Sequence, residues 1–249
     1  MNIRSRHRSR GLSMIEILVG LVVGLVMLAG MSSLVVGSRQ TSRSERQLLE
    51  MQATGRIAID VMGREIRKAG FRANRERSLS EVFPAAGAPF GTASAVVAAS
   101  AAADGLSVRF QGSGDSWTSD CLGNAVGAGH DIWETIWLQD GALQCRVRNL
   151  STNTEQTLAL IPQVEAMAIS FGIDDDGDGF ADASRSAAAV TNWSRVASVN
   201  VQLLIVSSED GLTEAAQPYL GFDGGAVIAS DRRLRRNYST VIALRNILP

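Results

Sequence analysis

Residues 11–36 read GLSMIEILVGLVVGLVMLAGMSSLVV, an apolar stretch in which Glu16 is the single charged residue. From Leu12 onward its 25 residues would form a helix of about 37 Å, longer than the ~30 Å hydrocarbon core of a membrane. The preceding residues 1–10, MNIRSRHRSR, contain four arginines and no acid. Basic residues before an apolar segment stay in the cytoplasm, so the sequence predicts a single-pass protein whose bulk lies beyond the membrane.

Three interpretations of this segment are open. A cleaved secretory signal peptide explains the basic and apolar order, but the apolar part is long and no Ala-x-Ala site follows it. A plain membrane anchor explains length and orientation but not Glu16, because an ionisable side chain inside an apolar span costs about 2.5–3.5 kcal/mol. The third interpretation gives Glu16 a function.

The string Gly11-Leu12-Ser13-Met14-Ile15-Glu16 closely resembles the type III signal of type IV pilins and type II secretion pseudopilins. The resemblance implies that a prepilin peptidase removes residues 1–11 as a leader by cutting between Gly11 and Leu12, with Leu12 then N-methylated. The family more often has Phe at this first mature position. Leu12 therefore departs from the family pattern, and the departure affects the prediction of N-methylation rather than the prediction of cleavage. Glu16 becomes mature residue five, where its carboxylate can neutralise the N-terminal amine of a neighbouring subunit and set the assembly register.

The helix is expected to continue beyond the membrane. Residues 38–68 contain no proline, and apolar or small residues recur there at three- and four-residue steps. These positions are Leu48, Met51, Gly55, Ile59, Met62, Ile66 and Ala69. Because Gly70 is a typical helix stop, we expect a membrane half at residues 12–37 and an amphipathic half at 38–69.

Residues 70–249 are predicted to form a periplasmic, β-rich globular head. The Ala- and Gly-rich residues 84–105 suggest mainly a loop with a short helical turn. Expected strands are Leu106–Phe110, Ile132–Leu138, Ala142–Arg148, Gln156–Ile161, Val164–Ile173, Val196–Val206 and Ser239–Leu244. Consecutive strands without helices between them favour an antiparallel sheet, and the turn at residues 139–141 (QDG) favours a hairpin. The expected fold class is therefore α+β, type IV pilin-like, with a long N-terminal helix packed on an antiparallel sheet.

The composition excludes several functional classes. A hydrophobic content of 45% with mean hydropathy +0.07 is not that of a disordered chain. There are 24 basic and 25 acidic residues, and loss of the leader would leave 20 basic ones. Such a balance argues against direct nucleic-acid binding through bulk charge. Two histidines and two cysteines are too few for most metal centres, and no catalytic nucleophile with its base can be named, so we expect no enzyme activity.

The two cysteines, Cys121 and Cys145, both fall in the predicted head. A disulfide is the expected state of an even pair in an oxidising periplasm, with two free thiols as the alternative. Closing this loop would contribute about 3.5 kcal/mol in the chain-entropy model. Neither His7 nor His130 is convincingly placed to activate a thiol.

Residues 174–182 read DDDGDGFAD and fit the pattern D-x-D-x-D-G-x-x-D. Oxygen ligands without His or Cys select Ca²⁺, so the sequence makes Ca²⁺ a candidate ion although no cofactor is required. The candidate ligands are Asp174, Asp176, Asp178 and Asp182. The string resembles EF-hand-like loops but has Arg185 where an EF-hand has its twelfth-position Glu. The alternative is an acidic, Gly-rich hairpin without an ion.

Residues 235–246 (RRNYSTVIALRN), together with residues 171–174 (FGID) and Trp193-x-x-Val196, resemble PilW-type minor pilins. The resemblance implies a non-catalytic subunit that primes type IV pilus assembly with other minor pilins, the major pilin and a PilY-type tip adhesin. Such a protein passes from the inner membrane, with its N-terminus cytoplasmic, into the extracellular pilus. A J-type minor pseudopilin of type II secretion is the nearest alternative, and a membrane-anchored periplasmic calcium-binding or hydrolytic protein is another. Arg235, Arg236 and Arg245 are interpreted as strand-edge charges.

Overall fold

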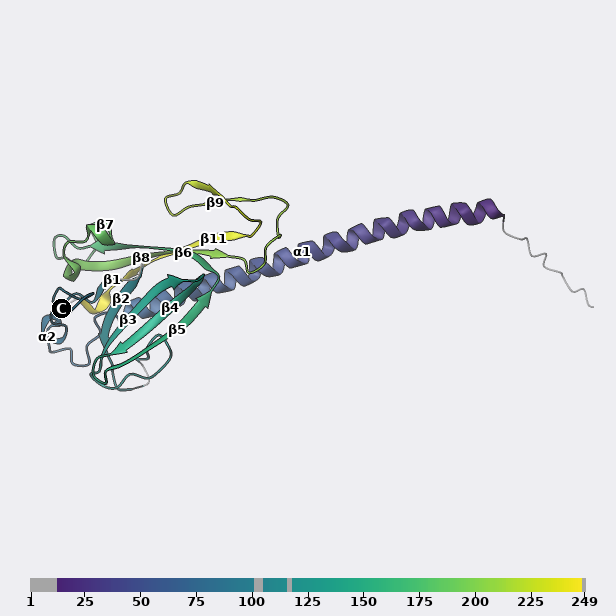
Figure 1. Ribbon diagram of the computed structural model, residues 1–249. Helices are drawn as coiled ribbons and strands as arrows, with labels where there is room; N and C mark the ends of the chain where they lie inside the picture. Colours follow the sequence, from purple (N-terminus) through teal and green to yellow (C-terminus); the bar gives the residue numbers. More distant parts are fainter. Residues whose placement is uncertain (1–12, 101–104, 116–117, 248–249) are drawn as a thin grey trace, which may run out of the picture. The chain divides into compact units, whose positions relative to one another are not determined.

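The computed structural model describes residues 13–100, 105–115 and 118–247 (Figure 1). The chain divides into two compact units, Met1–Arg46 and Gln47–Pro249, and helix α1 (Met14–Lys68) contributes residues to both. Within the described ranges, α1 is the one helix long and apolar enough to cross a membrane. The expected leader with its cleavage point at Gly11 and Leu12 lies outside the described residues.

The first unit is helical from Met14 onward, and its large apolar side chains up to Val36 are all exposed. A helix that is apolar on every side needs lipid or other helices around it. The two serines inside this stretch do not break it, because Ser32 and Ser33 donate their hydroxyls to the carbonyls of Leu28 and Gly30, each at 2.8 Å. The membrane boundary expected between residues 37 and 38 stays a prediction.

The second unit, the head, contains three antiparallel sheets. The five-stranded sheet has the order β1-β2-β3-β4-β5, the four-stranded sheet β11-β8-β6-β7, and the small sheet β10-β9. Strand bounds are β1 Val97–Ala99, β2 Leu106–Gln111, β3 Asp131–Gln139, β4 Ala142–Asn149, β5 Thr154–Pro162, β6 Val164–Ile173, β7 Ala183–Ser186, β8 Val196–Val206, β9 Pro218–Leu220, β10 Ala226–Ile228 and β11 Arg235–Ala243. The expected α+β class with an antiparallel head is confirmed.

Both large sheets pack on the last part of α1 and share one core with it. Met51, Met62 and Ile66 of α1 lie in the same buried cluster as Ile136 of β3 and Leu203 of β8. The predicted apolar stripe is therefore the face that organises the head. α1 ends at Lys68, as the glycine at position 70 indicated.

One position of the predicted stripe is wrong. Leu48 is exposed, and its neighbour Gln47 is buried instead. The amide oxygen of Gln47 accepts hydrogen bonds from the backbone N–H and the hydroxyl of Ser208, at 3.1 and 2.9 Å. A polar residue can be buried here because the chain after β8 supplies the donors that its side chain needs.

The interpretation of residues 84–105 was incomplete, because β1 lies within them. Val96 and Val97 are β-branched and fully buried beside β2, which favours a strand over a helical turn. The short helix α2 (Leu79–Val82) comes earlier and begins with a capping box between Ser78 and Glu81. The composition alone hid β1, since alanines surround the two valines.

The hairpin between β3 and β4 follows the predicted signal. Gln139 pairs with Ala142, so Asp140 and Gly141 form a two-residue loop with φ values of 52° and 72°. Two successive left-handed residues match the twist of the flanking strands, and Asp-Gly is a favoured pair for them. The strands β7, β9 and β10 were not predicted, and strands of three or four residues carry too short a pattern to be found from periodicity.

A close approach fixes the position of β11 against α1. Gly55 faces the ring of Tyr238, and a Cβ atom at Gly55 would overlap with that ring. The Tyr238 hydroxyl donates to the backbone carbonyl of Met51 at 3.3 Å. The glycine is thus needed for space in the helix rather than for flexibility.

We predict opposite effects for two glycine substitutions in α1. Gly55→Ala should lower the free energy of unfolding by about 1–3 kcal/mol, because the added methyl overpacks the Tyr238 contact. Gly63→Ala, whose Cβ would meet only the flexible end of Arg67, should be neutral or raise it by up to about 1 kcal/mol through helix propensity. Thermal unfolding of the detergent-solubilised chain, followed by near-ultraviolet circular dichroism, measures both. Equal stability of the two variants would contradict the packing argument.

Candidate functional site

Glu16 lies in the first turn of α1, where its carboxylate accepts the backbone N–H of Ser13 at 3.2 Å. The side chain is exposed, and within the described residues no cation forms a salt bridge with it. A negative charge near a helix N-terminus is favourable. Its second oxygen remains available to a donor from another molecule, as the register role predicted for Glu16 requires.

The acidic loop Asp174–Asp182 connects β6 to β7 in a hairpin. Two backbone hydrogen bonds close its ends: Asp182 donates to Ile173 at 2.8 Å, and Asp174 donates to the carbonyl of Arg195 at 2.9 Å. Gly177 and Gly179 have φ values of 90° and 89°, a conformation that a side chain disfavours. The glycines therefore allow the tight turns that fold the acids back on one another.

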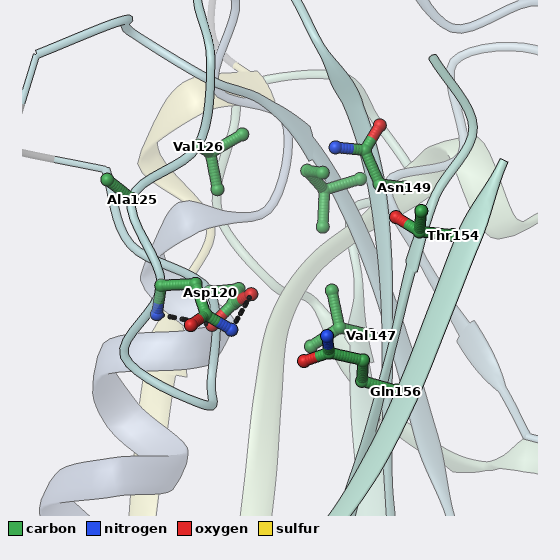
Figure 2. Close-up of a pocket in the computed structure, with 9 residues that line it drawn as sticks. Asp120, Ala125, Val126, Val147, Asn149, Thr154 and Gln156 are labelled. Atoms are coloured by element: carbon green, nitrogen blue, oxygen red, sulfur yellow. Dashed lines mark hydrogen bonds between the residues drawn. The ribbon is translucent and has the colours of Figure 1, made fainter. Parts of the chain in front are cut away.

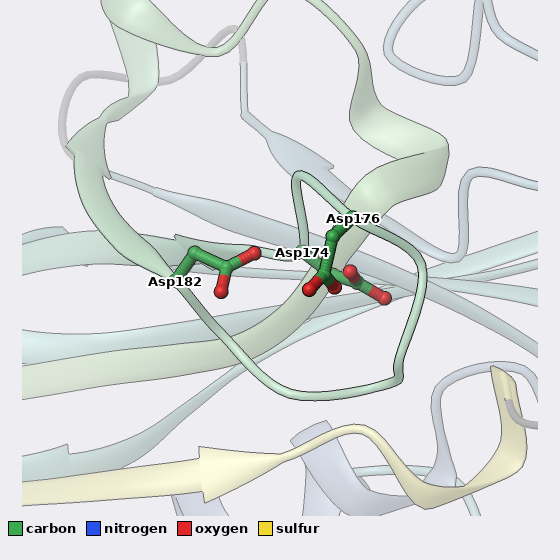
Figure 3. Close-up of side chains that lie close together, drawn as sticks. All are labelled: Asp174, Asp176 and Asp182. Atoms are coloured by element: carbon green, nitrogen blue, oxygen red, sulfur yellow. The ribbon is translucent and has the colours of Figure 1, made fainter.

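The loop brings three of the four predicted ligands together. One carboxylate oxygen each of Asp174, Asp176 and Asp182 lies within 4.8 Å of the others. Figure 3 shows the three side chains close together in the loop. Asp178 is outside this group, because its carboxylate turns back to accept the backbone N–H of Phe180 at 2.8 Å. Three oxygens converging on one point form a candidate centre for a hard cation.

Internal hydrogen bonds also stabilise the loop. Slight desolvation of Asp174 acts to raise its pKa, but the N–H groups of Gly177 and Gly179, at 2.5 and 2.9 Å, outweigh this effect and lower the pKa. The carboxylate is thus charged at neutral pH, as a cation ligand must be. Arg185, at the twelfth position, forms a 3.0 Å ion pair with Asp175, which is not one of the three acids that converge.

Cys121 and Cys145 form a disulfide in the structure. Cys121 belongs to the loop that precedes β3, and Cys145 lies on the inner face of β4, where both are buried. The bond fastens this loop to the sheet. His130 lies directly before β3 and contacts Asn149 through a 3.2 Å ring-nitrogen hydrogen bond, so it has a structural role.

A buried charge cluster, not foreseen from the sequence, joins α1 to the five-stranded sheet. Lys68 is the single lysine of the chain, and its ammonium pairs with Glu65 and, at 3.1 Å, with Glu134 of β3. It also donates to the carbonyl of Ser119 at 2.7 Å, and Glu134 accepts the N–H of Cys121 at 2.8 Å. The alternation of β3 contained the signal, because Glu134 falls between Ile132 and Ile136 on the core face.

Both carboxylates pair with the Lys68 ammonium and have zero exposure, and Glu65 also pairs with the exposed Arg64 at 3.0 Å. Burial raises the pKa of Glu134 to about 8; Lys68 opposes the shift, and the neighbouring Glu65 adds to it. Glu134 therefore keeps its proton at neutral pH. Arg235, which we expected as a strand-edge charge, has an almost buried side chain that pairs with Asp231 and Glu165. The hydrogen bond from Arg235 lowers the pKa of Asp231 to about 2.

A cavity of about 170 Å³ lies between the disulfide loop and the strands β4 and β5 (Figure 2). Its polar lining includes Asp120, Asn149, Thr154 and Gln156. The Asp120 carboxylate already accepts two hydrogen bonds from Asn124, at 2.8 and 3.1 Å. These groups hold the loop, and within the described lining no nucleophile is paired with a base, so the cavity does not resemble a hydrolytic centre.

An apolar anchor helix with one acid, followed by an amphipathic half packed on an antiparallel head, defines the type IV pilin-like class of membrane-anchored proteins. The prokaryotic N-terminal methylation motif matches residues 6–32, and the model of the type IV pilus-assembly protein W family, PilW, matches residues 127–246. Together the two matches support a PilW-type minor pilin of the type IV pilus. The two matches lie at opposite ends of the chain, on the anchor and on the head.

The structure is similar to that of a type IV-like pilin from Thermus thermophilus, with 14% identity and a TM-score of 0.48. The similarity covers 81% of this chain and 98% of the other. No curated protein matches the sequence.

We predict that stability of the head falls as pH rises. The folded head keeps a proton on Glu134 up to about pH 8, whereas the unfolded chain loses it near 4.5, so the free energy of unfolding should decrease between these values. Glu134→Gln should flatten this dependence, because the amide needs no proton. Exposed Glu155 of β5 supplies the control variant, Glu155→Gln. Urea unfolding at several pH values measures the slopes, and an unchanged slope in Glu134→Gln would contradict the assignment.

Proposed function

We propose that this minor pilin is made as a prepilin, cut after Gly11, methylated at Leu12 and stored in the inner membrane. From there it takes part in priming type IV pilus assembly. The observation that carries the proposal is the methylation motif on an apolar stretch, residues 12–36, whose single acid is Glu16. A soluble enzyme with a signal peptide would have no need of that acid.

The mechanism is assembly rather than chemistry. A carboxylate in lipid is costly, and pairing it with the N-terminal amine of a neighbouring subunit removes both charges at once. Only one axial position of the helix places Glu16 at that amine. The charge pair therefore selects the register, while the apolar side chains around it supply the adhesion between helices.

The head would choose the neighbours: other minor pilins, the major pilin and a PilY-type adhesin. The PilW match over residues 127–246 favours a pilus over the J-type pseudopilin of a secretion system, which shares the same leader and helix. It also favours a filament subunit over a membrane-anchored enzyme. Prepilin peptidase and membrane lipid are the partners of the N-terminal unit.

Glu16→Ala should leave cleavage intact but reduce incorporation into pili by at least about tenfold, because the N-terminal amine then loses its partner. The measurement is the amount of the protein in sheared pili against the amount in the inner membrane. Glu45→Ala, which removes an exposed acid from the same helix, should incorporate normally. Equal incorporation of both variants would refute the register role.

Processing is tested on the same samples by intact mass. The membrane form should lack residues 1–11 and carry one methyl group when prepilin peptidase is present, and should keep the leader when it is absent. A mature chain that starts beyond residue 36 would refute the pilin mechanism and support a secretory signal peptide.

We also propose that the acidic loop binds Ca²⁺ through Asp174, Asp176 and Asp182. The convergence of their oxygens within 4.8 Å supports the proposal, and backbone carbonyls and water would complete the shell. The ion would neutralise the repulsion between the carboxylates. Its role would be structural, because the loop joins two strands of the head.

For a site with a Kd of about 1 mM, Ca²⁺ at 10 mM should stabilise the head by roughly 1.4 kcal/mol. Asp182→Asn should abolish this gain, whereas Asp178→Asn, a neighbouring acid outside the group, should keep most of it. Thermal unfolding with Ca²⁺ and with Mg²⁺ measures the effect. Equal responses to the two ions, or none at millimolar Ca²⁺, would exclude the site.

A further inference from the structure

The outer face of the five-stranded sheet carries an unusual set of side chains. Trp133 and Trp137 of β3 and Arg146 and Arg148 of β4 point away from the core that the alternate residues of the same strands form. We call these four residues the Trp–Arg face. The tryptophans are half-buried and the arginines are exposed.

The indole rings hold the guanidinium groups in place. Arg146 lies over the ring of Trp137 at 5.8 Å, and Arg148 over that of Trp133 at 5.9 Å. Trp133 is itself fixed by an edge-on contact with the buried Phe90, whose ring is 5.1 Å away. Because the rings restrict them, both arginines lose less entropy on binding a ligand than free side chains would.

These two guanidinium groups form no ion pair with a described acid, although Glu155 lies on the neighbouring strand. Within residues 13–100, 105–115 and 118–247, neither forms a salt bridge or a hydrogen bond, whereas Arg185 and Arg235 do both. Glu155 of β5 stands beside Arg148 in the strand register but does not form an ion pair with it. The face therefore presents up to ten unused N–H donors of planar, charged groups.

A shallow cavity of about 140 Å³ opens on this face. Trp133 and Thr135 line it from β3, the two arginines from β4 and Glu155 from β5, and Ala88 and Pro89 of the segment before β1 close one side. The hollow is large enough for one small side chain beside the charged groups. Tryptophan and arginine around such a hollow are the residue types most enriched at the energetic centres of protein interfaces.

The geometry distinguishes between classes of polyanion. Single-stranded nucleic acids and sugars bind tryptophan by stacking on the ring face, and here a guanidinium 5.8 to 5.9 Å from each ring centroid competes for that face. The donors of the guanidinium groups remain open, and they match carboxylates in a bidentate manner. Residues 47–249 contain 17 basic and 23 acidic residues, so a long polyanion would also be repelled by the rest of the head.

We propose that the Trp–Arg face is a docking surface for an acidic segment of a protein partner, with carboxylates of that segment on Arg146 and Arg148. The inference depends on the head alone and would hold even if the pilus role proposed above failed. The two arginines form a local positive charge that attracts the acidic partner segment. The net negative charge of the rest of the head repels that segment when it docks elsewhere.

The test uses the full chain in a non-ionic detergent and a fluorescent peptide that alternates Glu with Gly. Binding is followed by anisotropy at low salt. Arg146→Glu/Arg148→Glu should weaken binding by about tenfold or more. The control Arg56→Glu/Arg236→Glu makes the same change in net charge at two other exposed arginines and should keep the affinity within about twofold. Both pairs are on the surface, so circular dichroism should show unchanged folding.

Two further probes complete the experiment. The same peptide with Gln in place of Glu should bind at least about tenfold more weakly, and an oligothymidine of equal charge should bind more weakly than the Glu peptide. Equal loss in both double variants would reduce the effect to bulk charge and overturn the proposal. Tighter binding of oligothymidine would overturn it in favour of nucleic acid, and absence of Glu-peptide binding would overturn it outright.

Discussion

Burial of one stripe of α1 between two sheets is the constraint on which the head depends. Neither sheet has a core of its own, since both place their inner residues in the one cluster that includes Met62 and Ile66. The same helix is apolar on every side between Met14 and Val36. One continuous helix is therefore suited to two environments: lipid or neighbouring helices along its first part, and a protein core along its last part.

Much of this arrangement could be predicted because it follows from periodicity. The spacing from Met51 to Ala69 gave the buried stripe, and β6 and β8 were found with their observed bounds. What failed was local. The strand at Val97 is short and surrounded by alanine, and the burial of Gln47 depends on Ser208, which lies 161 residues away in sequence. No pattern within a single segment contains such a contact.

The charged residues divide in the same way. The acids of the loop at 174–182 could be named from sequence because their spacing is local, although the exclusion of Asp178 depends on how its side chain turns. The Glu65–Lys68–Glu134 cluster could not be named, since it joins a helix to a distant strand. A buried triad of this kind adds little net stability, because desolvation offsets much of the attraction. Its value is positional: only one rotation of α1 satisfies it.

The arginines show how the head can be both stable and selective. Arg109 and Arg235 are buried, and each donates to several acceptors within the fold. Arg146 and Arg148 resemble them in being held by aromatic rings but differ in leaving their donors open. Folding does not require hydrogen-bond donors that are left open. Thr157 faces Arg146 across the strands, and an acid at position 157 could pair with the Arg146 guanidinium, whereas Thr157 forms no ion pair with it. A surface that keeps such groups unpaired is better explained by a partner than by the stability of the chain.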